Sequence, residues 1–368
     1  MTDGAMKKIH GTYGKTGGFS LVELMIAMTI GLILLAGLTL IFVNSSEANR
    51  ELQKTSQQIE NGRYAIDIIT QDLRNAGFFG HLHELPAAPG TLPDPCEIAS
   101  TTNLYNALAY PVQGYRSADL ATRADVTAST CDDKLLLTAA NLKPGSDVLV
   151  IRRANTTALT ATDTALNNEV YIQATSSQAA IRFGNGAAIG TNNNTNNGSG
   201  GASIPTFVYN NGTTPAPIRK YHVHVYFVAP CSLGSGANGV CQAGDDSIPT
   251  LKRLDLMRDP ADGARKMMLV PLVEGIEYMK VEYGVDNVPS TASLVTGLVG
   301  DATIDAYTPT PADWTTVARN TEATAGFTDD KTYTLGSIAV PAFNDRFKRH
   351  AYNMLTHLMS PAGRREIP

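Results

Sequence analysis

The chain has 368 residues, of which 43% are hydrophobic and 17% are charged. This length exceeds what a single helix with a tail would need and allows the chain to bury a core of its own. The formal net charge is −5, and because Met1–Gly18 carries Lys7, Lys8 and Lys15 against Asp3, the remainder carries −7. This acidic balance provides no basic face for nucleic acid, and we expect no nucleic-acid partner.

The first predicted element is an apolar segment from Phe19 to Val43 whose only charged residue is Glu23. Its length fits the roughly 20 apolar residues with which a helix crosses a bilayer. Lysines precede the segment, so we expect a cytoplasmic N-terminus and a periplasmic head. A carboxylate in hydrocarbon needs a cation, a hydrogen-bond donor or a proton. The sequence offers no such partner nearby, since Lys15 lies upstream of a diglycine.

That diglycine, Gly17 and Gly18, suggests a processing site. The segment Lys15–Met28, KTGGFSLVELMIAM, resembles the class III leader of type IV pilins and type II secretion pseudopilins. The resemblance implies that prepilin peptidase cuts between Gly18 and Phe19 and that Phe19 is then N-methylated. Cleavage would create an α-amine on Phe19, and the amine of a neighbouring copy or relative is the partner we expect for Glu23. The alternative is an ordinary signal peptide or signal anchor, but the apolar core of a signal peptide has only about 7–15 residues.

We expect the apolar segment to continue as an amphipathic helix. Apolar or small residues recur at steps of three and four, namely Ile59, Gly62, Ile66, Ile69, Leu73 and Ala76. Gly77 favours a helix end. No proline occurs between Phe19 and Pro86, so one helix from Phe19 to about Ala76 would measure on the order of 87 Å. In the pilin family the first half of this helix lies among other subunits and the second half anchors the head. Major pilins usually have a proline in the first half; this chain has Leu40 there, which favours a minor pilin.

The expected parts are therefore a leader peptide at 1–18, a transmembrane and filament-core helix at 19–43, an amphipathic second half at 44–76, and a periplasmic β-rich head at 77–368. Alternating patterns predict strands at 135–138, 147–152, 169–174, 180–183, 221–228, 250–257, 266–272 and 275–283. The turn formers of Asp259–Gly263 predict a hairpin between two of these strands. Antiparallel strands against one long helix indicate an α+β, pilin-like fold with large loop insertions. The segments 85–130, 192–201 and 286–327 have no assignable pattern.

The clearest predicted strand is Tyr221–Val228, because its side chains sort onto two faces. One face carries Tyr221, Val223, Val225 and Phe227. The other carries His222, His224 and Tyr226. The two histidines could share a metal ion, but we expect polar residues on a half-solvated sheet face instead.

The cysteines, Cys96, Cys131, Cys231 and Cys241, form an even set in the part expected outside the cytoplasm, which favours two disulfides. Spacing favours Cys231 with Cys241, which would close a glycine-rich loop and leave Cys96 with Cys131. Three connectivities remain open from the sequence alone. A zinc site is the alternative, but no C-x-x-C spacing occurs, and we expect no metal.

A second resemblance narrows the family. Leu269–Asp286, LVPLVEGIEYMKVEYGVD, is similar to a segment of PilW-type minor pilins and their J-type pseudopilin cousins. Asp72–Gly80, DLRNAGFFG, and Asp313–Val317, DWTTV, resemble further PilW elements. The tail Arg346–Arg365 is only loosely similar, which leaves the last strand in doubt. Within the first segment we expect a strand with an irregularity near Met279.

No catalytic constellation and no cofactor site is apparent. Gly14–Thr16 resembles the end of a phosphate-binding loop but lacks the earlier glycine and the preceding strand. The other weak candidates are His81 with His83, and two acidic pairs that could bind calcium but lack a twelve-residue ligand loop, Asp245–Asp246 and Asp329–Asp330. We expect Trp314 to serve packing.

The resemblance implies a non-catalytic minor pilin acting in type IV pilus assembly and priming, near the pilus tip. Its expected partners are prepilin peptidase, the inner membrane, other minor pilins and the major pilin through the N-terminal helix, and a PilY-type tip adhesin. It would span the inner membrane once and then enter the pilus at the cell surface, in support of twitching motility. Two alternatives stay open: a J-type pseudopilin of a type II secretion system, and a periplasmic enzyme or binding and adhesion module displayed on a pilin stem.

Overall fold

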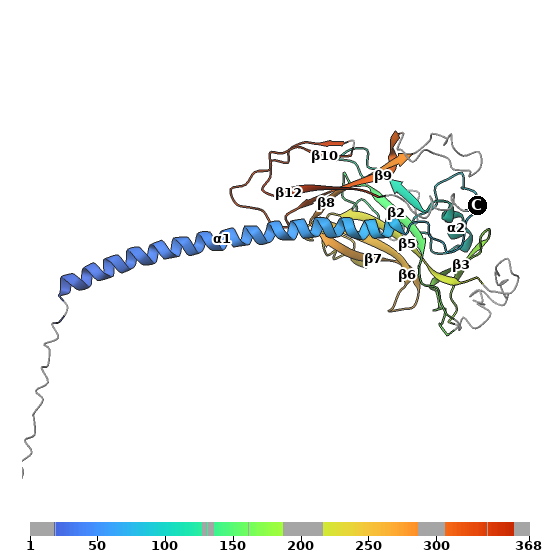
Figure 1. The fold of residues 1–368 in the computed structure, drawn as a ribbon, viewed down its shortest axis with the longest axis horizontal. Helices are drawn as coiled ribbons and strands as arrows, with labels where there is room; N and C mark the ends of the chain where they lie inside the picture. Colours follow the sequence, from blue (N-terminus) through green and yellow to red (C-terminus); the bar gives the residue numbers. More distant parts are fainter. Residues whose placement is uncertain are drawn as a thin grey trace, which may run out of the picture. The chain divides into compact units, whose positions relative to one another are not determined.

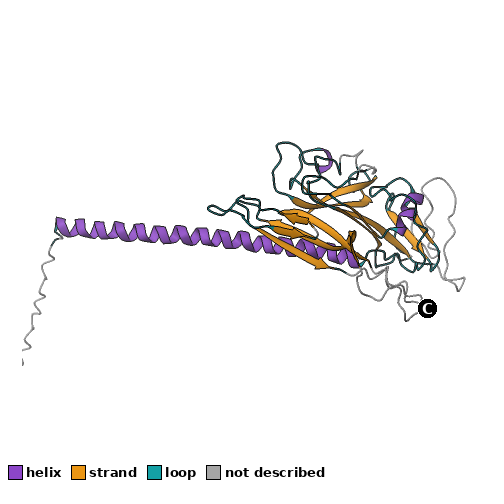
Figure 2. Ribbon diagram, turned by 90° about the horizontal axis from the view of Figure 1, so that it is seen from above, coloured by secondary structure: helices purple, strands orange, loops and turns teal. Residues whose placement is uncertain are grey.

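The computed structural model describes Gly18, Cys131 and residues 20–126, 136–160, 162–186, 216–285, 306–336 and 338–356, with the backbone alone for 283–285 and 306–315. The expected leader up to residue 17, Phe19, and the unassigned segments at 192–201 and 286–305 lie outside this description. The chain divides into two compact units, 1–53 and 54–368. The predicted α+β fold is confirmed by a long apolar helix and a set of antiparallel sheets (Figures 1 and 2).

The helix α1 spans Leu21–Arg74, within two residues of the predicted bounds at each end. It ends where expected, because Gly77 adopts a positive φ of 73°, which glycine tolerates without a steric cost. The Gly77 N–H then donates to the Arg152 carbonyl at 2.9 Å, which ties the end of the helix to a strand.

The second half of α1 packs on the head through a face that differs in part from the predicted one. The buried residues include Gln58, Gly62, Ala65, Ile69 and Leu73. The sequence pattern had instead placed Ile59 and Ile66 on the buried face, but Ile59 is 42% exposed and Ile66 is half-buried. The physical reason is that the sheet approaches the helix closely, so small residues and one amide occupy the contact positions.

The large sheet is entirely antiparallel. Its strands are β1 (Val112–Tyr115), β2 (Val148–Ala154), β3 (Val170–Ala174), β4 (Ala179–Phe183), β5 (Ile218–Ala229), β6 (Thr250–Arg258) and β7 (Arg265–Glu274). The long strand β5 is its centre, because residues 218–220 pair with β3, residues 221–226 with β2 and residues 224–229 with β6. The predicted hairpin is confirmed by the pairing of β6 with β7.

The two faces of β5 face two different cores, as its alternation predicted. Tyr221, Val223, Val225 and Phe227 lie in a core with both disulfides and the loops before β2. Tyr226 and Val228 lie in the other core, which contains Ala65, Ile69 and Leu73 of α1. The prediction of a half-solvated second face is therefore wrong, because α1 covers it and buries His224.

A smaller sheet with the order β12-β9-β8 continues from the large one, and it consists of β8 (Ile276–Val285), β9 (Ala306–Arg319) and β12 (Arg349–Leu355). The chain passes between the sheets at Gly275, whose φ is 78°. A Cβ there would lie 2.7 Å from the Arg319 carbonyl oxygen, so only glycine fits this close approach. The predicted strand irregularity exists, but it lies between Ile276 and Tyr278, slightly before the predicted Met279.

Other parts of the head were predicted less well. The segment left unassigned at 85–130 contains the short helix α2 (Thr101–Asn106), a 3-10 turn and β1. The strand predicted at 135–138 is wrong over its described part, since residues 136–138 form bends. Leu136 and Leu137 are apolar because they lie in the core that contains both disulfides. A hairpin of β10 (Tyr333–Leu335) and β11 (Ile338–Val340) was not predicted, and β12 settles the doubt about the last strand.

Candidate assembly site and its anchoring contacts

The start of α1 holds the residues that the leader resemblance singled out. Gly18 and Ser20 are exposed, and Phe19 lies outside the described residues. The Ser20 N–H donates to Glu23 Oε2 at 3.3 Å. A serine followed three residues later by a glutamate that reaches back to its N–H is the arrangement of a capping box. The expectation that Glu23 has no local hydrogen-bond donor is therefore wrong, because its own helix start supplies one.

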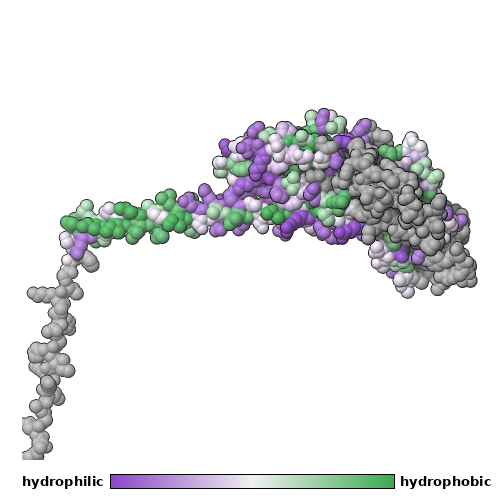
Figure 3. Space-filling model, turned by 45° about the horizontal axis from the view of Figure 1, so that its top comes forward, coloured by the Kyte–Doolittle hydropathy of each residue, from purple (hydrophilic) through white to green (hydrophobic). Residues whose placement is uncertain are grey.

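The following segment is a bare apolar surface within its own unit. All large apolar side chains from Leu21 to Val43 are between 46% and 75% exposed (Figure 3). Its hydroxyls are satisfied internally, since Thr29 Oγ1 donates to the Met25 carbonyl and Thr39 Oγ1 to the Leu35 carbonyl. By length and composition α1 can cross a membrane, with a mean hydropathy of 2.6 in its most apolar window. A surface of this kind requires lipid or other helices as its surroundings.

Two family models match the chain, one at each end. The prokaryotic N-terminal methylation motif matches residues 14–39, and the type IV pilus-assembly protein W family, PilW, matches residues 226–360. The resemblance to the PilW-type minor pilins is confirmed. A search of curated proteins and a search of solved structures each found no match. The PilW match begins at Tyr226, within β5, and includes every strand from β6 to β12.

The head holds α1 through a buried carboxylate that the sequence did not reveal. Asp72 accepts from Arg153 Nε at 2.5 Å, from Tyr226 Oη at 2.9 Å and from His224 Nδ1 at 2.6 Å. On the far side of His224, Asp255 Oδ1 lies 3.9 Å from Nε2. Asp72 thus joins α1 to both β2 and β5 with each oxygen satisfied.

The electrostatics of this cluster follow from burial and from the neighbouring cations. Burial alone would raise the pKa of Asp72, but the hydrogen bonds and charges of His224 and Arg153 lower this pKa below its ordinary value. Burial, together with the charges of His224 and Arg153, lowers the pKa of His222 to about 3. The His222 ring is therefore neutral at neutral pH, while Asp72 is ionised.

A second buried cluster fixes the start of β12. Arg349 donates to Glu277 at 2.6 Å, to Asp329 at 3.0 Å and to Asp345 at 2.6 Å. Burial opposes the charge of Arg349, but these carboxylates raise its pKa above the ordinary value. Tyr333 Oη donates to Asp329 at 3.0 Å. Asp329 is therefore used as an internal anion rather than as a calcium ligand.

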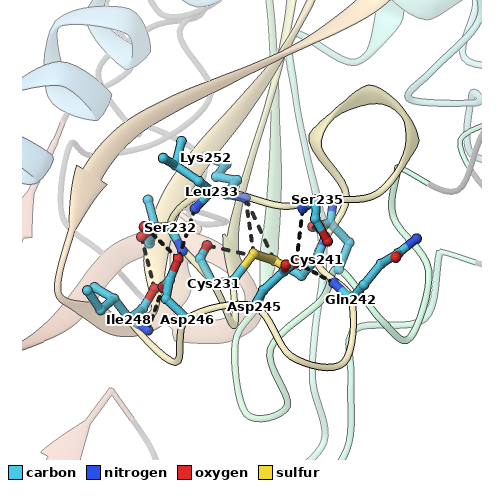
Figure 4. Close-up of a disulfide and its surroundings, with 12 residues drawn as sticks. Cys231, Ser232, Leu233, Ser235, Cys241, Gln242, Asp245, Asp246, Ile248 and Lys252 are labelled. Carbon is cyan, nitrogen blue, oxygen red and sulfur yellow. Dashed lines mark hydrogen bonds between the residues drawn. A yellow bond between two sulfur atoms is a disulfide. The ribbon is translucent and has the colours of Figure 1, made fainter.

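Both disulfides form as the spacing favoured, Cys96 with Cys131 and Cys231 with Cys241. The loop closed by Cys231–Cys241 is held by the acidic pair that follows it (Figure 4). Asp246 accepts from Ser232 N and Oγ at 2.9 Å, and Asp245 accepts from Gln242 N at 2.7 Å. These carboxylates cap a loop, and such capping explains their presence without calcium.

Two buried lysines differ in their partners. Lys280 Nζ lies 2.8 Å from Asp147 Oδ1, and the second oxygen of Asp147 accepts from Val281 N at 3.0 Å. Lys252 is only 1% exposed, and its ammonium contacts sulfur atoms: Nζ lies 3.8 Å from Cys231 Sγ and 3.7 Å from Cys241 Sγ (Figure 4). Burial lowers the pKa of Lys252. The Lys252 ammonium is thus the less well compensated charge of the two.

The remaining weak candidates do not form a site. Within the described part of the chain, no three His, Cys, Asp or Glu residues gather as a metal site would require. His81 and His83 are exposed, whereas His224 is committed to Asp72. Trp314 lies on β9 with only its backbone described, and Gly14–Thr16 lies outside the described residues. The polar clusters among the described residues join α1, the strands and the loops of the head to one another. The family matches indicate a structural pilus component.

Proposed function

We propose that this type IV pilin-like chain is a minor pilin that acts in pilus assembly and priming near the pilus tip, without catalysis. The proposal rests on one observation: the same chain has an exposed apolar helix, with Glu23 at its start, and a head that matches the PilW family. In this proposal prepilin peptidase cuts after Gly18, the chain spans the inner membrane at 19–43, and the head at 77–368 lies in the periplasm. Other minor pilins, the major pilin and a PilY-type tip adhesin are its partners.

Assembly would exchange lipid for the helices of other subunits, and Glu23 would set their axial register. In the single chain Glu23 accepts one neutral N–H at 3.3 Å, which is a long hydrogen bond. The cationic α-amine of a processed Phe19 on a neighbour would be a stronger partner, since charge-assisted hydrogen bonds are about twice as strong as neutral ones. A misplaced neighbour would leave a carboxylate without its cation in an apolar setting, which is heavily penalised.

The test is a comparison of Glu23→Ala and Glu23→Gln chains in the native host. Processing and membrane insertion should be unchanged in both, while incorporation into filaments falls strongly in Glu23→Ala and also in Glu23→Gln, which retains the cap but lacks the charge. Wild-type incorporation of Glu23→Gln would show that helix capping alone suffices and that the pairing proposal is wrong. Lost surface pili and twitching in a deletion strain would support the pilus role, whereas secreted enzymes held in the periplasm would indicate a J-type pseudopilin.

A further inference from the structure

A hollow of about 510 Å³ lies beside the second half of α1, within the unit 54–368. We call it the basic groove. It is lined by Thr55, Gln58, Ile59 and Arg63 of α1, by Phe327, Lys331 and Tyr333, and by Lys348, Arg349, His350 and Tyr352 around the start of β12. The Gln58 amide nitrogen donates to the carbonyls of Ala318 and Lys348 at 2.9 and 3.0 Å, so the wall made by α1 is fixed relative to the sheet.

The charge of the groove is opposite to that of the chain as a whole. Arg63, Lys331 and Lys348 come from three different elements and meet at this hollow, and none of the described residues that line it is acidic. Arg349 also lines it, but its charge is compensated by the buried carboxylates behind it. On the neighbouring loop, Glu322 is paired with Lys54 at 3.2 Å, and the exposed Asp330 lies next to Lys331 in the chain.

A polar group inside the groove also lacks a partner. The Tyr352 hydroxyl oxygen is buried and makes no hydrogen bond to any residue that the structure describes. The Tyr352 ring is held in place, because it packs so closely on Gly62 that a Cβ there would overlap it, and the His350 ring lies 4.6 Å away in a T-shaped contact. A buried hydroxyl without a partner costs about 1–3 kcal/mol. Ile59, 42% exposed, adds an apolar contact beside it.

We propose that the basic groove binds an acidic segment of a neighbouring pilin subunit, with a carboxylate between Arg63 and Lys331 and an apolar side chain on Ile59. This inference rests on the proposed function, which places other subunits beside α1. A lipid headgroup fits less well, because the groove lies well past Val43 along the helix, where the apolar segment ends. Electrostatic complementarity of this kind sets partner choice and register more than it sets affinity.

The experiment is site-specific photo-crosslinking of the full chain in its native host. A photoreactive amino acid replaces Ile59 in one strain and Leu35 of the apolar segment in another, and the crosslinked peptides are identified by mass spectrometry. The Leu35 probe reports packing of the helix among other subunits, which is the proposed function. The Ile59 probe reports the groove. The double charge reversal Arg63→Glu with Lys331→Glu tests the charges, and Arg74→Glu, on the exposed surface of the same helix, is the matched control.

We expect the Ile59 probe to crosslink to a peptide of another pilin-type subunit that carries Asp or Glu near the crosslinked residue. The double reversal should reduce this product roughly tenfold, as expected when attraction becomes repulsion, while Arg74→Glu leaves it unchanged and the Leu35 product persists in both. A crosslink to lipid, a crosslinked peptide without acidic residues, or an undiminished product in the double reversal would overturn the inference. Loss of the Leu35 product in the otherwise native chain would instead overturn the proposed function, and the inference with it.

Discussion

The Asp72 carboxylate and the His224 imidazole lie 2.6 Å apart, Oδ2 to Nδ1, although 151 residues separate them in the chain, and both side chains are buried. This contact joins the last turn of α1 to the central strand β5. A subunit that is pulled out of a membrane by its helix must transmit force from that helix to its head. The Asp72 cluster is the polar part of this connection, and the core formed by Ala65, Ile69 and Leu73 is the apolar part.

We predict that Asp72→Asn lowers the free energy of unfolding by about 3–5 kcal/mol, because it leaves the partly buried Arg153 without its anion. Denaturant unfolding of the full chain in detergent, followed by the fluorescence of its single tryptophan, measures the change. The control is Asp67→Asn, which removes a carboxylate from the exposed face of the same helix, where it accepts only from Gln71. This control should change stability by less than about 0.5 kcal/mol, and equal effects of the two substitutions would contradict the assignment.

The same cluster predicts a loss of stability in acid. The pKa of Asp72 is lowered in the folded chain, so its stabilising contribution is complete above the ordinary aspartate pKa and is lost as the pH falls below about 4. The wild-type chain should therefore lose stability between pH 4 and 2 more steeply than Asp72→Asn does. Parallel pH profiles for the two chains would show that Asp72 does not titrate as described.

The two buried lysines should respond in opposite ways to replacement by methionine. Lys280→Met leaves Asp147 as a buried unpaired carboxylate and should cost about 3–5 kcal/mol. Lys252→Met removes an ammonium that contacts two sulfur atoms, so stability should be unchanged or increased. Thermal unfolding of both variants measures this, and a large destabilisation by Lys252→Met would reveal a compensating partner.

Gly62 is required by the close approach of Tyr352. Gly62→Ala should destabilise the chain by about 1–3 kcal/mol, because the added methyl group overlaps the ring. The double variant with Gly62→Ala and Tyr352→Ala should regain part of the stability that Tyr352→Ala loses alone. Gly37→Ala is the control, since open space surrounds that position and no loss is expected. Additive effects at Gly62 and Tyr352 would argue against the contact.

The sequence predicted those features that depend on local patterns. The bounds of α1 followed from hydropathy and Gly77, the two faces of β5 from alternation, and the Cys231–Cys241 disulfide from short spacing. Features that depend on distant contacts could not be predicted in this way. Nothing in the local sequence marks Asp72 as an anchor, because its partners come from strands far along the chain.

The same limit explains the errors. Ile59 and Ile66 fit an ideal helical stripe, but the close approach of the sheet selects Gln58 and Ala65 for the contact instead. Leu136 and Leu137 fit a strand, but they lie in a loop and are buried in the core that contains both disulfides. The basic groove combines residues of α1, a loop and β12, and its charges carry no local signature.

The intact mass of the chain purified from membranes of its native host shows whether the chain is processed as a pilin. We expect a single species that begins at Phe19 and carries one added methyl group on its α-amine. A mass that retains Met1, or one that corresponds to a cut downstream of Val43, would contradict it, because Glu23 would then have no neighbouring amine with which to pair.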